Sequence, residues 1–184
     1  NSDLLLKPDM SSFRVLPWLS NGKAQGAVMA DIYPADKAEP LEEVPRYLLQ
    51  RAVKKLKAEL GASVNIFGAP ECEFHLIEKA PNGELRLHGQ GSYFSSPPTD
   101  KALDLRGEFC SALERMGVKI FKQHHESLRG KHEIDIEYDQ AVNIADKVML
   151  NKMVLRKIAT DHGLIITFMP KPFPDLAGCG AHFH

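Results

Sequence analysis

Acidic residues and histidines are gathered in three short segments whose spacings suit metal binding. The segments are Glu71-Cys72-Glu73, the stretch 124–133, and Gly180-Ala181-His182-Phe183-His184. Residues i and i+2 of a β-strand point to the same face, so Glu71 and Glu73 would converge, as would His182 and His184. Carboxylates crowded on one face repel one another unless a cation lies between them. The pattern therefore predicts a site for two divalent ions, built on a sheet.

The acidic pairs also have a plainer interpretation, which is the exposed face of a half-buried strand. The residues around Glu71 and Glu73 are apolar, however, and buried carboxylates need partners or a metal. A second acidic pair, Glu126 and Glu133, flanks a tight turn, so a hairpin would bring the two residues opposite one another. The stretch 133–137 alternates acids with isoleucines, which favours an amphipathic strand with Asp135 facing solvent. Glu137 belongs to the same alternating stretch and is also expected to face solvent.

His182 and His184 follow Gly178-Cys179-Gly180, where small residues allow another group to approach the backbone closely. Metal ligands and satisfied core histidines both remain open for this pair. Oxygen-rich ligation favours magnesium or manganese over zinc, and these ions most often serve phosphoryl transfer. The chain has neither a Gly-x4-Gly-Lys-Ser/Thr loop nor a Gly-x-Gly-x-x-Gly turn, so any ATP site is of another kind.

The composition is that of an ordinary soluble globular domain. The 184 residues are 43% hydrophobic and 26% charged, with a net charge of -1. That balance gives no electrostatic case for nucleic acid or for an anionic membrane. The sequence lacks a membrane-spanning apolar run and a signal-peptide pattern. Three widely spaced cysteines indicate no disulfide framework and fit a reducing cytoplasm.

The order of the expected elements favours an α+β fold with a largely antiparallel sheet and helices on one side. Apolar periodicity predicts helices over 45–60, 101–116 and 140–162, the second capped by Thr99 or Asp100 and the third by Asp139. Strands are expected over 13–16, 26–32, 64–77, 118–125, 132–138, 164–169 and 181–184. An Asn-Gly turn at 21–22 should join the first two, and 68–70 should bend the third. The last strand stops on His184, so we expect the chain to be part of a longer polypeptide.

Five segments together resemble the glutamine synthetase family, in that family's order and approximate spacing. They are residues 67–74, 91–94, 124–126 with 130–135, 167–172 and 178–184. The resemblance covers nearly the whole chain, from Asp3 to His184. It implies the curved antiparallel sheet of that family's catalytic domain, and an ATP-dependent ligase. In such an enzyme ATP phosphorylates the side chain of glutamate, and ammonia then displaces the phosphate to give glutamine.

The resemblance also implies roles for individual residues, carried over position by position. One Mg²⁺ or Mn²⁺ ion would be held by Glu73, Glu126 and Glu133, and the other by Glu71 and His182. The substrate and nucleotide contacts implied are Tyr93 and Glu126 near the ammonium pocket, Gly178 at glutamate, and His184 near the ATP phosphates.

Several departures from the family pattern accompany the resemblance. Ala177 stands in place of an asparagine that helps hold the amino acid, and Phe121 in place of a nucleotide-contacting glutamate. The family's N-terminal β-grasp domain and the later part of the catalytic domain are expected to lie outside residues 1–184. The family assembles as a ring homo-oligomer, a dodecamer, with sites between subunits. We therefore expect this part alone to be inactive.

Three other functions remain open from the sequence. The nearest is a γ-glutamyl-amine ligase, acting on a polyamine or monoamine, with a pocket around Tyr93 that admits the larger amine. A second is a non-catalytic structural homologue, although every metal-ligand position within this span is retained. A third is a plain metal- or nucleotide-binding module that forms no acyl phosphate.

Overall fold

The computed structural model describes residues 3–184, which divide into two compact units. The first unit comprises the chain up to Gly68 together with Tyr138–Lys147, and the second comprises Ala69–Glu137 with Val148–His184. Every strand pairing within the described residues is antiparallel, and helices accompany the sheets, so the expected α+β class is confirmed. No helix within 3–184 has the length and apolar character needed to cross a bilayer.

The first unit consists of three two-stranded ribbons and a helix. Its elements are β1 (Leu4–Pro8) paired with β4 (Ala30–Pro34), the 3-10 turn η1 (Met10–Ser12), β2 (Arg14–Ser20) paired with β3 (Lys23–Ala27), α1 (Pro45–Leu60), and β5 (Phe67–Gly68) paired with β10 (Asp139–Gln140). The predicted hairpin turn is confirmed, because Asn21 and Gly22 both have positive φ, 50° and 73°. The helix predicted from Pro45 is confirmed as α1.

Arg46 of α1 joins the pieces of this unit through three carboxylates. It contacts Asp9 at 2.6 Å, Asp31 at 2.8 Å and Asp146 at 3.0 Å. Hydrogen bonding to Asp146, ahead of the opposing effect of burial, raises the pKa of Arg46. A two-stranded ribbon buries too little apolar surface to hold its own shape, so this network supplies part of the missing constraint.

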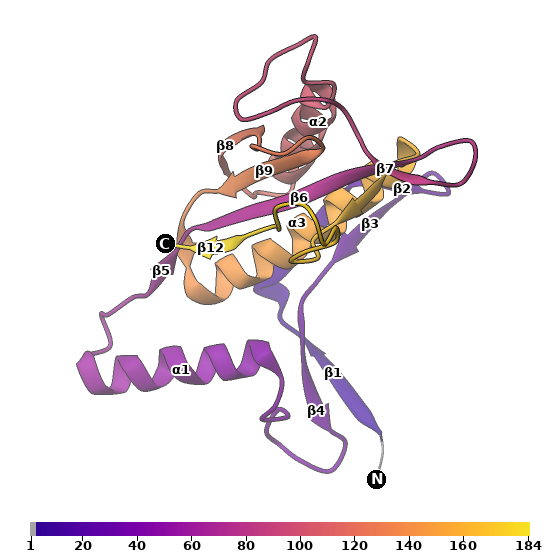
Figure 1. Ribbon diagram of the computed structural model, residues 1–184. Coiled ribbons are helices and arrows are strands. Elements are labelled where there is room, and N and C mark those ends of the chain that lie inside the picture. Colours follow the sequence, from indigo (N-terminus) through magenta and orange to yellow (C-terminus); the bar gives the residue numbers. More distant parts are fainter. Residues whose placement is uncertain (1–2) are drawn as a thin grey trace. The chain divides into compact units, whose positions relative to one another are not determined.

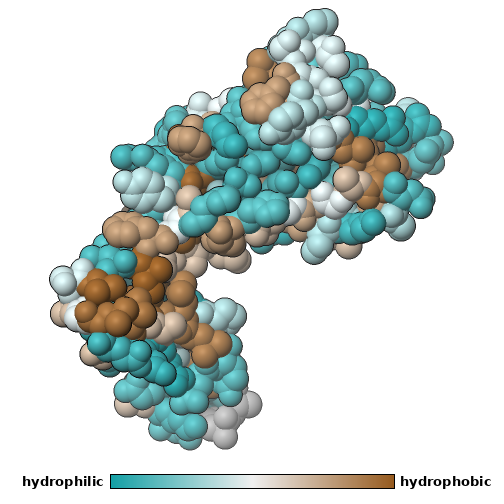
Figure 2. All heavy atoms as spheres, turned by 60° about the vertical axis from the view of Figure 1, so that its left-hand side comes forward, coloured by the Kyte–Doolittle hydropathy of each residue, from teal (hydrophilic) through white to brown (hydrophobic). Residues whose placement is uncertain are grey.

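The first unit also leaves large apolar side chains in contact with solvent. Leu4, Leu5 and Leu6 of β1 are 55%, 57% and 69% exposed, and Leu60 at the end of α1 is 64% exposed. Figure 2 shows brown, hydrophobic side chains gathered at the lower left of the view. An apolar surface of this kind is typical of protein that is covered by a partner.

The second unit is built around one long strand, β6. The sheet runs in the order β11-β6-β9-β8, and β7 and β12 also pair with β6 (Figure 1). The strands are β6 (Pro70–Lys79), β7 (Leu85–Leu87), β8 (Ile120–His125), β9 (Lys131–Ile136), β11 (Ile165–Thr167) and β12 (Ala181–Phe183). The helices are α2 (Leu103–Arg115) and α3 (Ala141–Asp161), the latter beginning in the first unit.

Alternation along β6 separates the two faces of this sheet. Phe74 is fully buried and meets the fully buried Phe109 of α2, with ring centroids 6.0 Å apart. Ile134 of β9 is also fully buried. The intervening residues Glu71, Glu73, Glu133 and Asp135 are acidic, so alternation places apolar side chains in the core and these carboxylates on the opposite face.

Three sequence expectations differ from the structure. The strand expected over 26–32 is divided into β3 and β4, which pair with β2 and β1 respectively. The strand expected over 64–77 is divided at Ala69 into β5 and β6, because its two parts pair with different strands. The predicted cap of α2 is wrong, since Ala102 is the N-cap and makes no side-chain capping bond. Asp100 accepts a hydrogen bond from the Ala102 N–H at 3.0 Å, but its carboxylate is also held by Arg106. The ion pair with Arg106, and not a helix cap, therefore determines how the Asp100 side chain is used.

Candidate functional site

Four carboxylates face one another across β6 and β9. In the register of this pair, Glu71 lies opposite Asp135, and Glu73 lies opposite Glu133. Like charges placed directly opposite in a sheet are destabilising. The arrangement therefore calls for a positive charge on this face, which agrees with the first inference from the sequence.

The flanking strands β8 and β12 add further residues beside these two cross-strand pairs. On β8, His124 lies opposite Glu133, and Lys122 lies opposite Asp135. On β12, His182 lies opposite Glu71. The sheet thus assembles segments that are more than 100 residues apart in the chain.

Two groups of three side chains are close enough to share a cation. His124, Glu126 and Glu133 offer ligand atoms within 4.8 Å of one another, and so do Glu71, Glu133 and Asp135. Glu133 belongs to both groups, so its carboxylate could help to hold an ion at either one. The family resemblance implied a different grouping, with Glu73 beside Glu126 and Glu133, and His182 beside Glu71.

The atoms of these groups fit a divalent cation. Burial, followed by hydrogen bonding with Asp135 and Glu126, raises the pKa of Glu133 to about 9. His124 Nε2 and Asp135 Oδ1 are buried and have no hydrogen-bond partner within the described chain. Buried polar atoms are normally satisfied, so these two atoms are candidates to bind a cation. Four carboxylates and one imidazole form an oxygen-rich set that suits Mg²⁺ or Mn²⁺.

The expected exposure of Asp135 was wrong. Asp135 is 5% exposed and belongs to the second group, whereas the side chain of Glu137 is 42% exposed, as expected. Alternation along β9 puts Asp135 on the same face as Glu133, and β9 is a central strand with β6 and β8 on either side. The sequence carried a signal for this placement, because Glu133 and Asp135 have the same i, i+2 spacing as Glu71 and Glu73.

The sequence of this chain matches a family model and the sequences of known proteins. The model described as "Glutamine synthetase, catalytic domain" matches residues 42–184. The chain belongs to the glutamine synthetase family. It is 40% identical over 185 residues to the glutamine synthetase of Methanocaldococcus jannaschii, and 39% identical over 188 residues to that of Thermus thermophilus.

Solved structures of the family share the fold. A ligand-free structure of GmaS superposes with a TM-score of 0.86 at 28% identity, covering 100% of this chain and 42% of that one. A glutamine synthetase from Plasmodium falciparum superposes with a TM-score of 0.85 at 22% identity, covering 99% and 40% respectively. The chain spans about two-fifths of the length of its curated relatives. The whole of this chain aligns with 40% of the Methanocaldococcus protein and with 42% of the Thermus protein.

The predicted ligand Glu73 is held by protein groups. Its Oε2 lies 2.6 Å from Lys131 Nζ and also accepts a hydrogen bond from the Gly180 N–H. Lys131 also lies 3.7 Å from Glu126 Oε2. No role for Lys131 could be predicted from the sequence, because its position beside two acids depends on the pairing of β6 with β9.

The C-terminal histidines lie beside Glu71. His184 Nε2 is 3.0 Å from Glu71 Oε1, and its side chain is 66% exposed. The ring of His182 lies against Gly180, since a Cβ on that glycine would come within 2.3 Å of His182 Nε2. Gly178, the expected glutamate contact, lies against the backbone of Pro170. The glycines therefore let this loop fold closely onto its own neighbours.

The loop over residues 91–94 covers the histidines of β8. Phe94 stacks on His124 at a centroid distance of 4.7 Å, and Tyr93 meets the same ring edge-on at 5.5 Å. Tyr93 itself is 57% exposed. The predicted ammonium-pocket residue Tyr93 is thus placed beside the first group of potential ligands. Among the departures from the family pattern, Ala177 is exposed and Phe121 is 74% exposed.

Gly91→Ala is expected to lower the free energy of unfolding by about 1–3 kcal/mol, the usual cost of an overpacked site. A Cβ at Gly91 would lie 2.3 Å from Nε2 of His125. That ring has little freedom to move, since it is 1% exposed and its Nδ1 bonds to the Glu126 carbonyl at 2.7 Å. Urea unfolding of the full-length protein measures the change. Gly107→Ala in α2 is the matched control, because nothing lies within 4 Å of its Cβ position and no loss is expected there.

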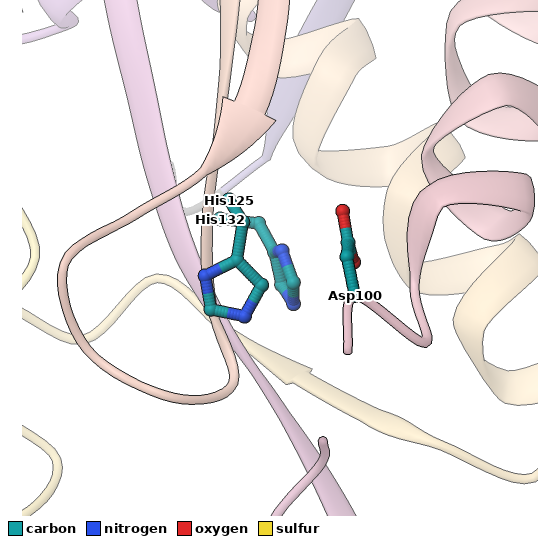
Figure 3. A group of neighbouring side chains, drawn as sticks. All are labelled: Asp100, His125 and His132. Atoms are coloured by element: carbon teal, nitrogen blue, oxygen red, sulfur yellow. The ribbon is translucent and has the colours of Figure 1, made fainter. Parts of the chain in front are cut away.

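A second cluster lies on the opposite, core-facing side of the sheet. Asp100, His125 and His132 offer ligand atoms within 4.8 Å of one another, and Figure 3 shows Asp100 facing the two imidazoles from the segment before α2. Arg106 already supplies a positive charge here, since its guanidinium binds Asp100 at 2.6 Å and 3.1 Å and His132 Nδ1 at 2.9 Å. The cluster is therefore a buried ion-pair network that supports β9 from behind.

Acid is expected to destabilise the protein through His132. Burial, and then the charge of Arg106, lowers the pKa of His132 from 6.5 to about 2. Between those values the unfolded chain binds a proton that the folded chain does not, so stability falls as the pH falls below 6.5. Each bound proton contributes a slope of up to about 1.4 kcal/mol per pH unit. Chemical unfolding of wild type and His132→Gln from pH 7.5 to 4 measures this, and the variant should show the shallower loss. Parallel curves would contradict the assignment.

Proposed function

We propose that the full-length protein is an ATP-dependent ligase that forms a γ-glutamyl phosphate from glutamate and transfers the γ-glutamyl group to ammonia. The observation that carries this proposal is the shared carboxylate Glu133, which joins two cation-competent groups on one face of the sheet. Membership of the glutamine synthetase family supports it. When bound, two Mg²⁺ or Mn²⁺ ions would offset the negative charge that develops on the transferring phosphoryl group.

The proposal gives the chain's own residues distinct tasks. The five ligand positions inferred from the family are Glu71, Glu73, Glu126, Glu133 and His182, and the geometry adds His124 and Asp135 as candidates. Glu126, buried beside His124, is proposed to accept a proton from the incoming ammonium ion. Tyr93 is proposed to form the outer wall of the ammonium pocket.

The remaining contacts are assigned to the loop around β12. Gly178 is proposed to contact glutamate through its backbone, because the Pro170 carbonyl oxygen occupies the place that a side chain would take. His184 is proposed to contact the phosphates of ATP, which its 66% exposed side chain leaves it free to approach. An acyl phosphate must be shielded from water, so a complete site needs cover over this face.

A γ-glutamyl-amine ligase is the second candidate, and the exposure of Tyr93 favours it. Tyr93 and Phe94 are 57% and 61% exposed, so the ammonium side of the pocket has no wall beyond them within residues 3–184. An organic amine larger than ammonia would fit such an opening. The chemistry of phosphoryl transfer is the same for either amine.

The test is phosphate release by the full-length protein with ATP, Mg²⁺ and glutamate, comparing ammonia with a panel of monoamines and polyamines. Release with ammonia supports glutamine synthesis. Release that depends on an organic amine moves the assignment to the γ-glutamyl-amine ligases. Mn²⁺ binding without release for any amine would overturn both and favour a non-catalytic homologue or a binding module.

We further propose that the protein works as a homo-oligomeric ring, a dodecamer by analogy with its family. The exposed leucines of β1 and the other exposed apolar side chains of the first unit support an interface between copies of the protein. Sedimentation velocity gives the mass directly. A monomer at micromolar concentration that nevertheless turns over would contradict the proposal.

A further inference from the structure

The loop that leads into β12 carries Gly178, the proposed glutamate contact. This 170–180 loop is closed at its base, because the Cys179 N–H donates to the Pro170 carbonyl at 2.8 Å. Gly178 lies against the same carbonyl. A glycine has no side chain with which to anchor itself, so the place of the Gly178 backbone is set by its neighbours.

Three contacts fasten this loop to β6. Glu73 and His75 are two residues apart, so both point to the face of the strand that bears the carboxylates. The Gly180 N–H donates to Glu73, and the Sγ of Cys179 lies 2.9 Å from Nδ1 of His75. Phe173, near the start of the loop, meets the His75 ring edge-on with centroids 5.9 Å apart. His75 therefore contacts the loop near both of its ends.

His75 depends on Cys179 for its polar contact. The imidazole is fully buried, and its Nε2 has no hydrogen-bond partner among residues 3–184. Burial raises the pKa of the Cys179 thiol to about 11, so the thiol keeps its proton at neutral pH and is able to donate it to Nδ1. A buried polar group that loses its partner costs free energy. The contact therefore favours one position of the thiol.

We propose that Cys179 and His75 are positioning residues that set the place of the Gly178 backbone and thereby the affinity of the site for glutamate. This inference rests on the proposed function and extends it to two side chains that are not themselves substrate contacts. The Gly178 carbonyl and the Cys179 N–H belong to one rigid peptide unit, so a shift of Cys179 moves the Gly178 backbone with it. A misplacement of about 1 Å in a group that positions substrate is enough to weaken its interaction.

The first test is steady-state phosphate release by full-length Cys179→Ala. We expect the KM for glutamate to rise about three- to tenfold, the scale of one hydrogen bond. The kcat and the KM for ATP should stay within about twofold, since a loss shared by the ground state and the transition state raises KM alone. Cys179→Ser keeps a donor for His75 and should restore most of the wild-type KM. Cys110→Ala is the matched control, because it removes another partly buried thiol, in α2.

Two results of this test would overturn the proposal. A lower kcat with an unchanged KM for glutamate would show that the thiol only keeps the protein folded. A serine variant as impaired as the alanine variant would show that the hydrogen bond is not what positions the loop.

The second test asks whether the two side chains act as a pair. His75→Phe keeps an aromatic ring beside Phe173 and removes the acceptor, so it should raise the KM for glutamate as Cys179→Ala does. Combining the two substitutions should give no further rise, because both remove the same contact. Multiplied losses in the double variant would contradict the proposal. His75→Asn, whose side-chain oxygen replaces Nδ1 as acceptor, should stay near wild type and serves if His75→Phe does not fold.

Isothermal titration calorimetry with glutamate, in the presence of ADP and Mg²⁺ and without turnover, separates this inference from the ligase proposal. Circular dichroism establishes that each variant is folded. A Kd raised about three- to tenfold in Cys179→Ala, in a protein that releases no phosphate with any amine, supports the inference and overturns the ligase proposal. Phosphate release with the same glutamate affinity in every variant gives the reverse. No glutamate binding by the wild-type protein overturns the inference, because the loop then has no glutamate affinity to set.

Discussion

Arg106→Met is expected to lower the free energy of unfolding by about 3–5 kcal/mol, the cost of breaking a buried ion pair by removing one partner. The Arg106 side chain is 2% exposed and that of Asp100 is fully buried, so the substitution strands a carboxylate in the core. Burial opposes the charge on Asp100, but the Arg106 hydrogen bonds outweigh it and lower the pKa of Asp100. Urea unfolding of the full-length protein, followed by far-UV circular dichroism, measures the change.

Two comparisons make this prediction specific. Arg86→Met removes an ion pair with the same 2.6 Å separation, but both side chains are 55% exposed, and little change is expected. Adding Asp100→Asn to Arg106→Met removes the stranded charge and should recover part of the lost stability. A loss in Arg106→Met no larger than that in Arg86→Met would show that the buried network is not what supports β9.

Glu126→Gln is expected to reduce phosphate release by about 100-fold or more, the scale seen when one preorganised electrostatic group is removed from an active site. The amide keeps the shape of the side chain but loses the charge. Glu126 lies 3.4 Å from His124 and has a ligand atom within 4.8 Å of Glu133, so its charge serves both ion binding and proton acceptance. Steady-state phosphate release at saturating ATP and glutamate gives the ratio.

The matched control is Glu137→Gln, the same chemical change at a side chain that is 42% exposed and pairs with Lys119. Wild-type turnover is expected for it. Raising Mn²⁺ should restore part of the activity of Glu126→Gln if weakened ion binding is the main defect. Full activity of Glu126→Gln at ordinary Mg²⁺ would remove Glu126 from the site.

Local sequence patterns correctly predicted the elements whose signals are contained within a few residues. The Asn21-Gly22 turn forms because both residues accept positive φ, and α1 begins at Pro45 because proline suits the first helical turn. The i, i+2 spacing of Glu71 and Glu73 placed both carboxylates on one face of β6, as strand geometry requires. These properties depend on backbone geometry over short distances in the chain.

The side chains that complete the site were decided by the tertiary structure. Asp135 was expected to face solvent, yet β9 lies between β6 and β8, so alternation turned it toward other acids. The contact of Arg106 with His132 and that of Lys131 with Glu73 form only when α2 and β6 pack beside β9, so neither had a local signal. The sequence by itself determined the acidic face and the family. The register between distant strands decided which charges meet there, because cross-strand neighbours are set by pairing over long separations and not by spacing along one strand.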